Sequence, residues 1–120
     1  LYINNGKGKF TKNPNALPKY LTSGSCVIPN DFDNDGDLDL FIGGRLVPKK
    51  YPHAANSHLL ENRGGRFVEV SNQKAPEFNN LGMVTSASWF DYNKDGLDDL
   101  VVVGEWRLMS WSSNSLISIH

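Results

Sequence analysis

An acidic nine-residue pattern that occurs twice constrains the fold of this sequence more than any other feature. Each copy has Asp at positions 1, 5 and 9, Asp or Asn at position 3, and Gly at position 6. The copies span residues 31–39 and 91–99, a spacing of 60 residues (91 − 31), and each continues into apolar residues and a Gly. A repeat of about 60 residues accommodates about four strands, the size of one β-propeller blade.

A second element repeats with nearly the same period. Residues 1–10 (LYINNGKGKF) resemble residues 59–67 (LLENRGGRF), with Asn and then Gly at matching places 57 to 58 residues apart. Repeat units cannot bury their apolar faces alone, and closed propellers contain about four to eight blades. We therefore expect these 120 residues to be a segment of a larger propeller, whose remaining blades come from the same longer chain or from oligomerisation.

The predicted secondary structure is all-β. Eleven Gly and six Pro are spread along the chain, and apolar residues form short clusters rather than recurring at helical spacing. Seven runs are typical of short antiparallel strands: 1–4, 26–28, 38–42, 59–61, 67–70, 85–90 and 100–103. Together they predict about two blades. Residues 1–23 would be the closing hairpin of a preceding blade, 24–82 a complete blade, and 83–120 the opening strands of the next, with an irregular tail over 105–120.

The net charge of -1 conceals a strong separation of charge. Nine of the 13 acidic residues lie in the two nine-residue windows, which contain one base, Lys94. The windows therefore carry -5 and -3, and the remaining 11 bases and four Glu give +7. Two concentrated acidic sites on a basic background direct the search for function to these windows.

Oxygen-rich loops of this kind are typical of calcium, which takes about six to eight oxygen ligands. Alternate residues supply carboxylates, the Gly permits a sharp turn, and the residue at position 7 offers its backbone carbonyl. The first predicted site consists of Asp31, Asp33, Asp35, Asp37 and Asp39. The second consists of Asp91, Asn93, Asp95, Leu97 and Asp99. Two Ca²⁺ ions are expected, one in each loop.

An EF-hand, a metal-free turn and a magnesium site each fit the acidic loops less well. An EF-hand would need an acidic residue at position 12, where the sequence has Ile42 and Val102. The residues after each loop favour strands, so each loop is interpreted as a hairpin connection closed by the Asp at position 9. A plain Asp-Gly turn needs no metal, but five carboxylates in nine residues repel one another unless a cation compensates them. Magnesium demands a tight octahedron and retains waters.

At these residues the sequence resembles the FG-GAP and VCBS repeats of integrin-α-like β-propellers, especially the bacterial secreted type. The resemblance covers residues 1–106 and is most specific where each loop continues into Asp-Leu, apolar residues and Gly. Gly43-Gly44 and Pro48 loosely match the end of the family signature, whereas Gly104-Glu105-Trp106 departs from it.

The resemblance implies a propeller of four-stranded blades that binds calcium within its blades. It also implies an extracellular, cell-surface or periplasmic location and a role in adhesion to a protein or carbohydrate ligand at a surface. No signal peptide is visible in the sequence. The alternative is a non-catalytic scaffold within a larger secreted enzyme that acts on carbohydrate.

Further chemistry has little support. The acidic clusters are accounted for as ligands and the four Glu have no catalytic context, so no enzyme activity is expected within this segment. His53 and His58 lack partners at a zinc-ligand spacing and are interpreted as solvated loop residues. Arg63-Gly64-Gly65-Arg66 resembles an RGG element, but a single copy at a predicted turn does not predict nucleic-acid binding. No apolar run approaches the ~18 residues that a membrane span requires.

Three smaller features complete the predictions. Four aromatic residues are candidates for a sugar-binding platform: Trp89, Tyr92, Trp106 and Trp111. Trp89 and Phe90, directly before the second loop, are better interpreted as core between blades, and Cys26 as a small buried apolar residue. Residues 45–56 form the longest strand-free connection, and Lys49-Lys50-Tyr51-Pro52 within it is predicted to face a partner.

Overall fold

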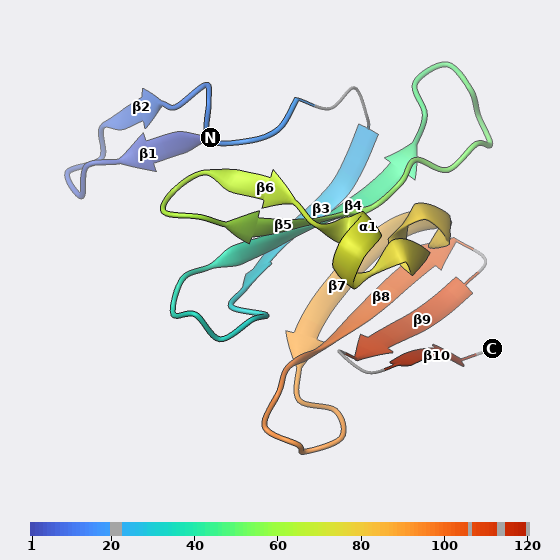
Figure 1. Cartoon of the computed structure of the whole chain (residues 1–120). Helices are drawn as coiled ribbons and strands as arrows, with labels where there is room; N and C mark the ends of the chain where they lie inside the picture. Colours follow the sequence, from blue (N-terminus) through green and yellow to red (C-terminus); the bar gives the residue numbers. More distant parts are fainter. Residues whose placement is uncertain (20–22, 106, 113–114, 120) are drawn as a thin grey trace.

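Antiparallel strands build the part of the chain that a computed structural model describes, residues 1–19, 23–105, 107–112 and 115–119 (Figure 1). A two-stranded sheet contains β1 (Tyr2–Asn4) and β2 (Phe10–Lys12). A four-stranded sheet contains β3 (Ser23–Asn30), β4 (Asp39–Leu46), β5 (His58–Asn62) and β6 (Phe67–Glu69). A second one contains β7 (Met83–Phe90), β8 (Asp99–Glu105), β9 (Arg107–Ser112) and β10 (Ser115–Ile119).

In both four-stranded sheets each strand pairs with the next along the chain. Such a meander needs only hairpin connections, which short strands separated by Gly, Asn and Asp turns provide. The prediction of an all-β fold with antiparallel strands is confirmed, and the arrangement is consistent with a fragment of a propeller-like repeat.

The predicted irregular tail is wrong, because strands β9 and β10 lie within residues 107–119. A single residue separates β8 from β9, whereas residues 47–57 separate β4 from β5. The shorter connection shifts the later strands out of the 60-residue spacing, and for this reason the repeat is not recognisable in the sequence there. Trp106 lies outside the described residues, as does the side chain of Trp111. The boundaries between blades remain a prediction.

A short helical link joins the two four-stranded sheets. It consists of α1 (Ser71–Lys74) and the 3₁₀ helix η1 (Pro76–Asn80), which has its Pro in the first turn, where no intrahelical donor is needed. The sequence did not predict these helices, since four or five residues are too few to show a helical period. Among the described residues, no helix has the length and apolar character needed to cross a membrane.

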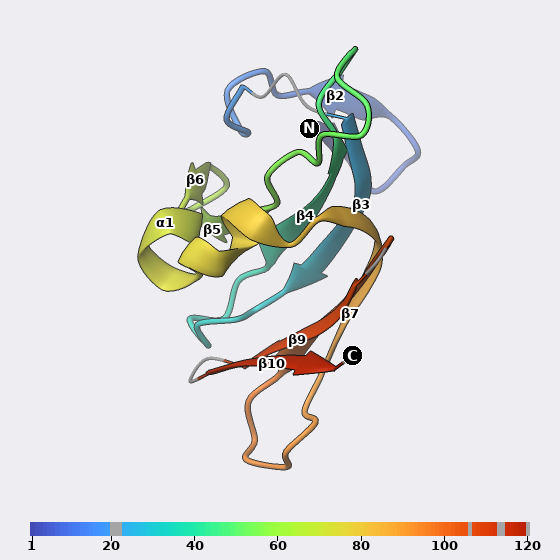
Figure 2. The same cartoon turned by 90° about the vertical axis from the view of Figure 1, so that its right-hand side faces the viewer.

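The core lies between the two sheets and beneath the helical link (Figure 2). Phe41 of the first sheet meets Phe78 of η1 edge to face, with ring centroids 5.3 Å apart, and both side chains are fully buried. The other members of this cluster are Leu59, Val70, Ala75, Leu81, Val84, Leu100 and Val102. Cys26 and Trp89 pack against the cluster and are partly buried, in line with their prediction as core residues. The same prediction is wrong for Phe90, which is the last residue of β7, is 43% exposed and meets the ring of Tyr92 edge to face instead of the core.

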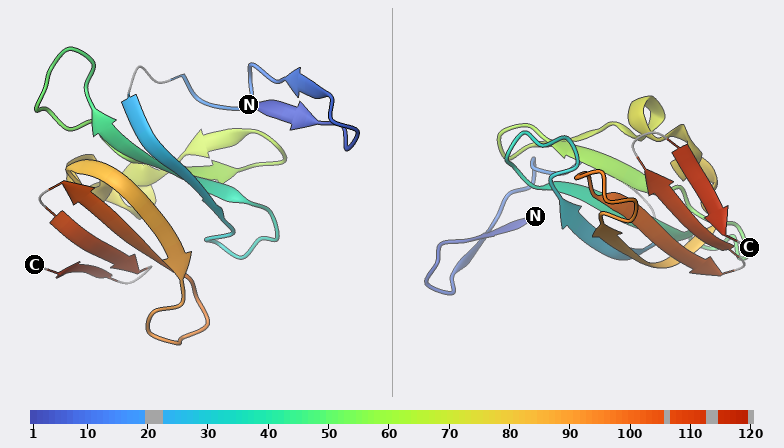
Figure 3. Two further views of the ribbon diagram at one scale, coloured as in Figure 1. Left: turned by 180° about the vertical axis from the view of Figure 1, so that it is seen from behind. Right: turned by 90° about the horizontal axis from the view of Figure 1, so that it is seen from below.

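The β1–β2 hairpin lies to one side of the two sheets (Figures 1 and 3). Its apolar side chains are exposed, including Tyr2 (63%) and Phe10 (61%). The segment after the hairpin is tied to the first sheet by a backbone hydrogen bond from Phe67 N to Ala16 O (2.8 Å), and Ala16 is buried there. The hairpin itself therefore adds no side chain to the common core.

Candidate metal centre

Both acidic loops join neighbouring antiparallel strands. Residues 31–38 connect β3 to β4 and residues 91–98 connect β7 to β8, and both loops lie at the same end of the molecule (Figures 1 and 3). The strand pairs that close them are equivalent, because Asn30 pairs with Asp39 and Phe90 pairs with Asp99. The interpretation of the loops as hairpin connections is confirmed.

The two loops share one backbone conformation. Asn34 and Lys94 have φ values of 59° and 61°, and Gly36 and Gly96 have φ values of 95° and 88°. These values lie in the left-handed region that Gly adopts without strain and Asn tolerates better than Lys. The Gly at position 6 is therefore required by the turn itself.

Side-chain carboxylates hold the first loop in this turn. Asp31 Oδ1 accepts a hydrogen bond from Asp35 N (3.1 Å), and Asp31 Oδ2 accepts one from Gly36 N (3.0 Å). Asp35 Oδ1 accepts one from Asp37 N (3.0 Å). In the second loop, Asp91 accepts from Asp95 (3.1 Å) and Gly96 (2.9 Å), Asp95 from Leu97 (2.9 Å), and Asp99 from Tyr92 (3.1 Å). The 60-residue repeat thus extends to individual hydrogen bonds.

Asp39, at the start of β4, is the most buried carboxylate of the first loop, with 1% of its surface exposed. Its Oδ1 accepts a hydrogen bond from Asn62 N (2.8 Å) and its Oδ2 accepts one from Phe32 N (3.2 Å). Burial raises the pKa of Asp39 to about 6, although these two hydrogen bonds oppose the shift. An anion in this position is stabilised by backbone donors but destabilised by its loss of water.

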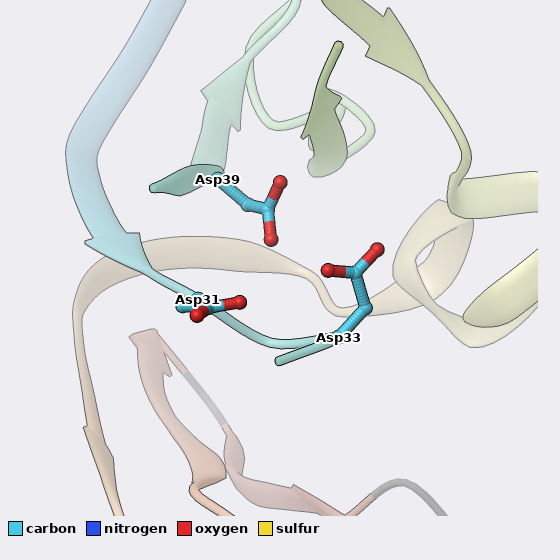
Figure 4. Close-up of side chains that lie close together, drawn as sticks. All are labelled: Asp31, Asp33 and Asp39. Atoms are coloured by element: carbon cyan, nitrogen blue, oxygen red, sulfur yellow. The ribbon is translucent and has the colours of Figure 1, made fainter. Parts of the chain in front are cut away.

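The first loop brings three carboxylates to one point. Oxygen atoms of Asp31, Asp33 and Asp39 lie within 4.8 Å of one another (Figure 4). Asp33 Oδ1 and Asp37 Oδ1 are buried from solvent without a hydrogen-bond partner in the described residues. Burial and the charges of the neighbouring aspartates raise the pKa of Asp37. Converging anions and unpartnered buried oxygens are the arrangement that a hard cation such as Ca²⁺ would compensate.

The second loop is less converged. It contributes no group of three carboxylate oxygens at this separation in the described part of the chain. Asn93 replaces one carboxylate and donates through Nδ2 to Asp95 Oδ2 (2.9 Å). Asp98, which is not a predicted ligand, accepts a hydrogen bond from Asn30 Nδ2 (2.9 Å) and so joins this loop to the end of β3. The predicted second site has the same turn with fewer anions.

Sequence reasoning missed one charged neighbour of the first loop, Lys74. Its Nζ lies 3.5 Å from Asp33 Oδ2 and 3.5 Å from Glu61 Oε2. Lys74 stands 41 positions after Asp33 (74 − 33) in the helix α1, which showed no sequence signal. The ammonium group of Lys74 reaches the acidic loop because the fold places α1 beside it.

The remaining candidates have simpler roles. His53 is exposed, as predicted, but His58 is a half-buried strand residue whose Nδ1 lies 2.9 Å from Glu69 Oε2, so its interpretation as a solvated loop residue is wrong. Glu69 also accepts a hydrogen bond from the hydroxyl of Ser71 and thereby joins β6 to α1. Neither His belongs to a group of three metal-binding side chains within the described residues.

The antiparallel four-stranded sheets are consistent with a fragment of a β-propeller-like repeat. Residues 1–42 match the family model described as FG-GAP-like repeat. This segment contains the β1–β2 hairpin, β3 and the complete first acidic loop, and the predicted resemblance to the FG-GAP repeat family is confirmed. A search of curated proteins and a search of solved structures each found no match.

Proposed function

We propose that this chain is a calcium-binding segment of an FG-GAP/VCBS-type β-propeller, in which the metal has a structural role. The convergence of Asp31, Asp33 and Asp39 within 4.8 Å is the observation that carries the proposal. Calcium would hold these carboxylates together and use the oxygens of Asp35 and Asp37 to approach its usual coordination number. Ca²⁺ bound to the folded state alone stabilises that state by mass action, so the ion fixes the β3–β4 hairpin.

The second loop supports a second, weaker calcium site. Its turn and its hydrogen bonds match those of the first loop, while Asn93 and Lys94 make it less negative. Ligand charge is one of the factors that set calcium affinity, so the second loop should release its ion first.

Calorimetric titration of chelator-treated protein tests the metal assignment. Two Ca²⁺ ions should bind per chain, and Asp33→Ala and Asp95→Ala should each remove one. Asp98→Ala is the matched control, because Asp98 lies in the same loop as Asp95 but its carboxylate contacts Asn30. Binding of less than one Ca²⁺ per chain would exclude the assignment. Magnesium in excess should compete weakly, because it accommodates this many protein oxygens poorly.

The same proposal assigns the protein to the cell surface or the extracellular or periplasmic space, as a binding or adhesion module. Residues 47–57 support this role, since they project from the end of the first sheet opposite the acidic loops (Figure 3). Tyr51 is 75% exposed, and the loop is held by a hydrogen bond from Val47 N to His53 O (3.0 Å). Exposed aromatic and basic side chains on an ordered loop are suited to a protein or carbohydrate ligand.

Binding to a panel of immobilised glycans and purified surface proteins tests this part. A Lys49→Ala/Tyr51→Ala variant should lose binding while retaining both calcium ions. Substitution of Lys12 by Ala, on the β1–β2 hairpin, is the control for the loss of an exposed base. Equal binding by the loop variant would exclude residues 47–57 as the contact surface.

A further inference from the structure

Lys74 is held at the first acidic loop by three separate contacts. Its ammonium lies 3.5 Å from one oxygen of Asp33 and 3.5 Å from one oxygen of Glu61. It also lies 4.7 Å from the centroid of the Phe32 ring, within the range of a cation–π contact. Two carboxylates and an aromatic face therefore fix the position of one cation.

The helix α1 positions the backbone of Lys74 beside the first acidic loop. Lys74 is the last residue of α1, and its backbone N donates to Val70 O (3.0 Å). Phe32 itself lies within the acidic loop and packs against the core cluster. The side chain of Lys74 is 38% exposed, so its contacts with the two carboxylates are partly open to solvent.

The two oxygens of Asp33 differ in their contacts, and Lys74 is near one of them. Asp33 Oδ2 pairs with Lys74, whereas Asp33 Oδ1 is buried without a hydrogen-bond partner in the described residues and belongs to the carboxylate that converges with Asp31 and Asp39. One carboxylate thus faces the lysine with one oxygen and has a second oxygen unused. A divalent ion bound among the three aspartates would experience the positive charge of Lys74 through this carboxylate.

We propose that Lys74 is the internal counterion of the first acidic loop and that it sets the loop's affinity for calcium. It neutralises part of the negative charge when no metal is bound, and so it stabilises the empty loop. It repels a bound divalent cation for the same reason, and so it weakens calcium binding. The second statement rests on the proposed function, because it requires that the first loop binds calcium.

The second loop provides an internal comparison. Within the described residues, no Lys or Arg forms an ion pair with its carboxylates. The loop with more anions is therefore paired with a lysine from another element, whereas the only base of the second loop in the described chain is Lys94 within the loop itself, which forms no ion pair there. Removing the counterion should increase the difference in affinity between the two loops.

The test measures calcium binding to the first loop alone. In an Asp95→Ala background, in which the second site is disabled, Lys74→Gln and Lys74→Met should each bind Ca²⁺ about three- to fivefold more tightly, as expected for loss of a partly exposed charge contact. Lys74→Arg should bind as the parent does. Lys12→Met, which removes an exposed lysine at the end of β2, should also leave affinity unchanged. In the presence of chelator, the melting temperature of both neutral variants should fall below that of the parent.

The outcomes separate this inference from the proposed function. Absence of calcium binding in both wild-type protein and the Asp95→Ala parent would exclude the metal site itself. Calcium binding in the parent with unchanged or weaker affinity in the neutral Lys74 variants would overturn the role of Lys74. Lys74→Gln retains most of the stem and an amide donor for Asp33, so it provides the measurement if Lys74→Met does not fold.

Discussion

Arg45 and Glu105 occupy equivalent positions of the 60-residue repeat and form an ion pair with each other. Arg45 Nη2 lies 2.5 Å from Glu105 Oε1, and the contact joins β4 of the first sheet to β8 of the second. A strictly identical repeat would place like charges at these two positions and separate the sheets. The divergence of the two copies therefore contributes directly to the contact between them.

Reversing one charge of this pair should destabilise the protein, and reversing both should restore stability. Arg45→Glu should lower the free energy of unfolding, and the addition of Glu105→Arg should recover it. The side chains are 42% and 37% exposed, so the coupling should be small, about 0.2–1 kcal/mol. Urea unfolding of the two single variants and the double variant measures it. Strictly additive effects of the single variants would contradict the pairing.

Gly44 should not tolerate a side chain. A Cβ atom at this position would lie 2.2 Å from Asn56 O and 2.5 Å from Ala55 O, so the backbone of the neighbouring segment would have to move. We expect Gly44→Ala to cost about 3 kcal/mol in thermal or chemical unfolding, as for an overpacked core. Gly24→Ala is the control, because its nearest contact would be 3.4 Å from Gly43 O. Equal stability of the two variants would contradict the close approach.

The stability of the metal-free protein should fall as the pH rises from about 4 to about 6. The pKa of Asp39 is raised to about 6 in the folded state, so Asp39 binds more protons in the folded chain than in the unfolded chain within this range. Calcium requires the deprotonated carboxylate, so stabilisation by calcium should appear over the same range and reach its full value above about pH 6. Thermal unfolding with calcium and with chelator across this range measures both effects.

Asp39→Asn provides the control for that pH dependence. The amide cannot titrate, so the metal-free variant should lose the fall in stability, and its calcium-dependent stabilisation should also decrease. A variant with the same pH profile as the wild-type protein would show that another group is responsible.

Lys94→Asn should raise the stability of the second loop and strengthen its calcium binding. Lys94 has a φ of 61°, a conformation that Asn adopts more readily, and Asn occupies the equivalent position 34. The substitution also removes the one positive charge of the second window. We expect about 0.5–1 kcal/mol of added stability without metal and tighter calcium binding at this loop, measured by thermal unfolding and by calorimetry. Weaker calcium binding would contradict the charge argument.

The sequence was sufficient to predict the acidic hairpins because the turn inside each loop is formed by local contacts. Asp31 bonds to backbone groups four and five residues later, and Gly36 provides the left-handed turn. Local constraints of this kind appear as fixed spacings in the sequence. The seven predicted strands are likewise confirmed, since each apolar run lies within or overlaps an observed strand.

The features that the sequence did not predict depend on contacts between segments distant in the chain. The helical link is stabilised by packing of Phe78 against Phe41, a contact that no sequence period reveals. Strands β9 and β10 follow a one-residue connection, so their spacing no longer matches the repeat. Lys74 reaches the first loop only because α1 folds back beside β5 and the loop. Tertiary packing, rather than local pattern, determines these features.

The two sequence repeats share one core between the sheets. Phe41 and Leu59 belong to the first sequence repeat, whereas Val84 and Leu100 belong to the second, and all four side chains are buried in one cluster. The repeat is therefore not the folding unit, since an excised repeat would expose one half of an apolar interface. A duplication of one repeat in the gene copies both faces of that interface, and each new copy remains stable only where its faces match those of its neighbours.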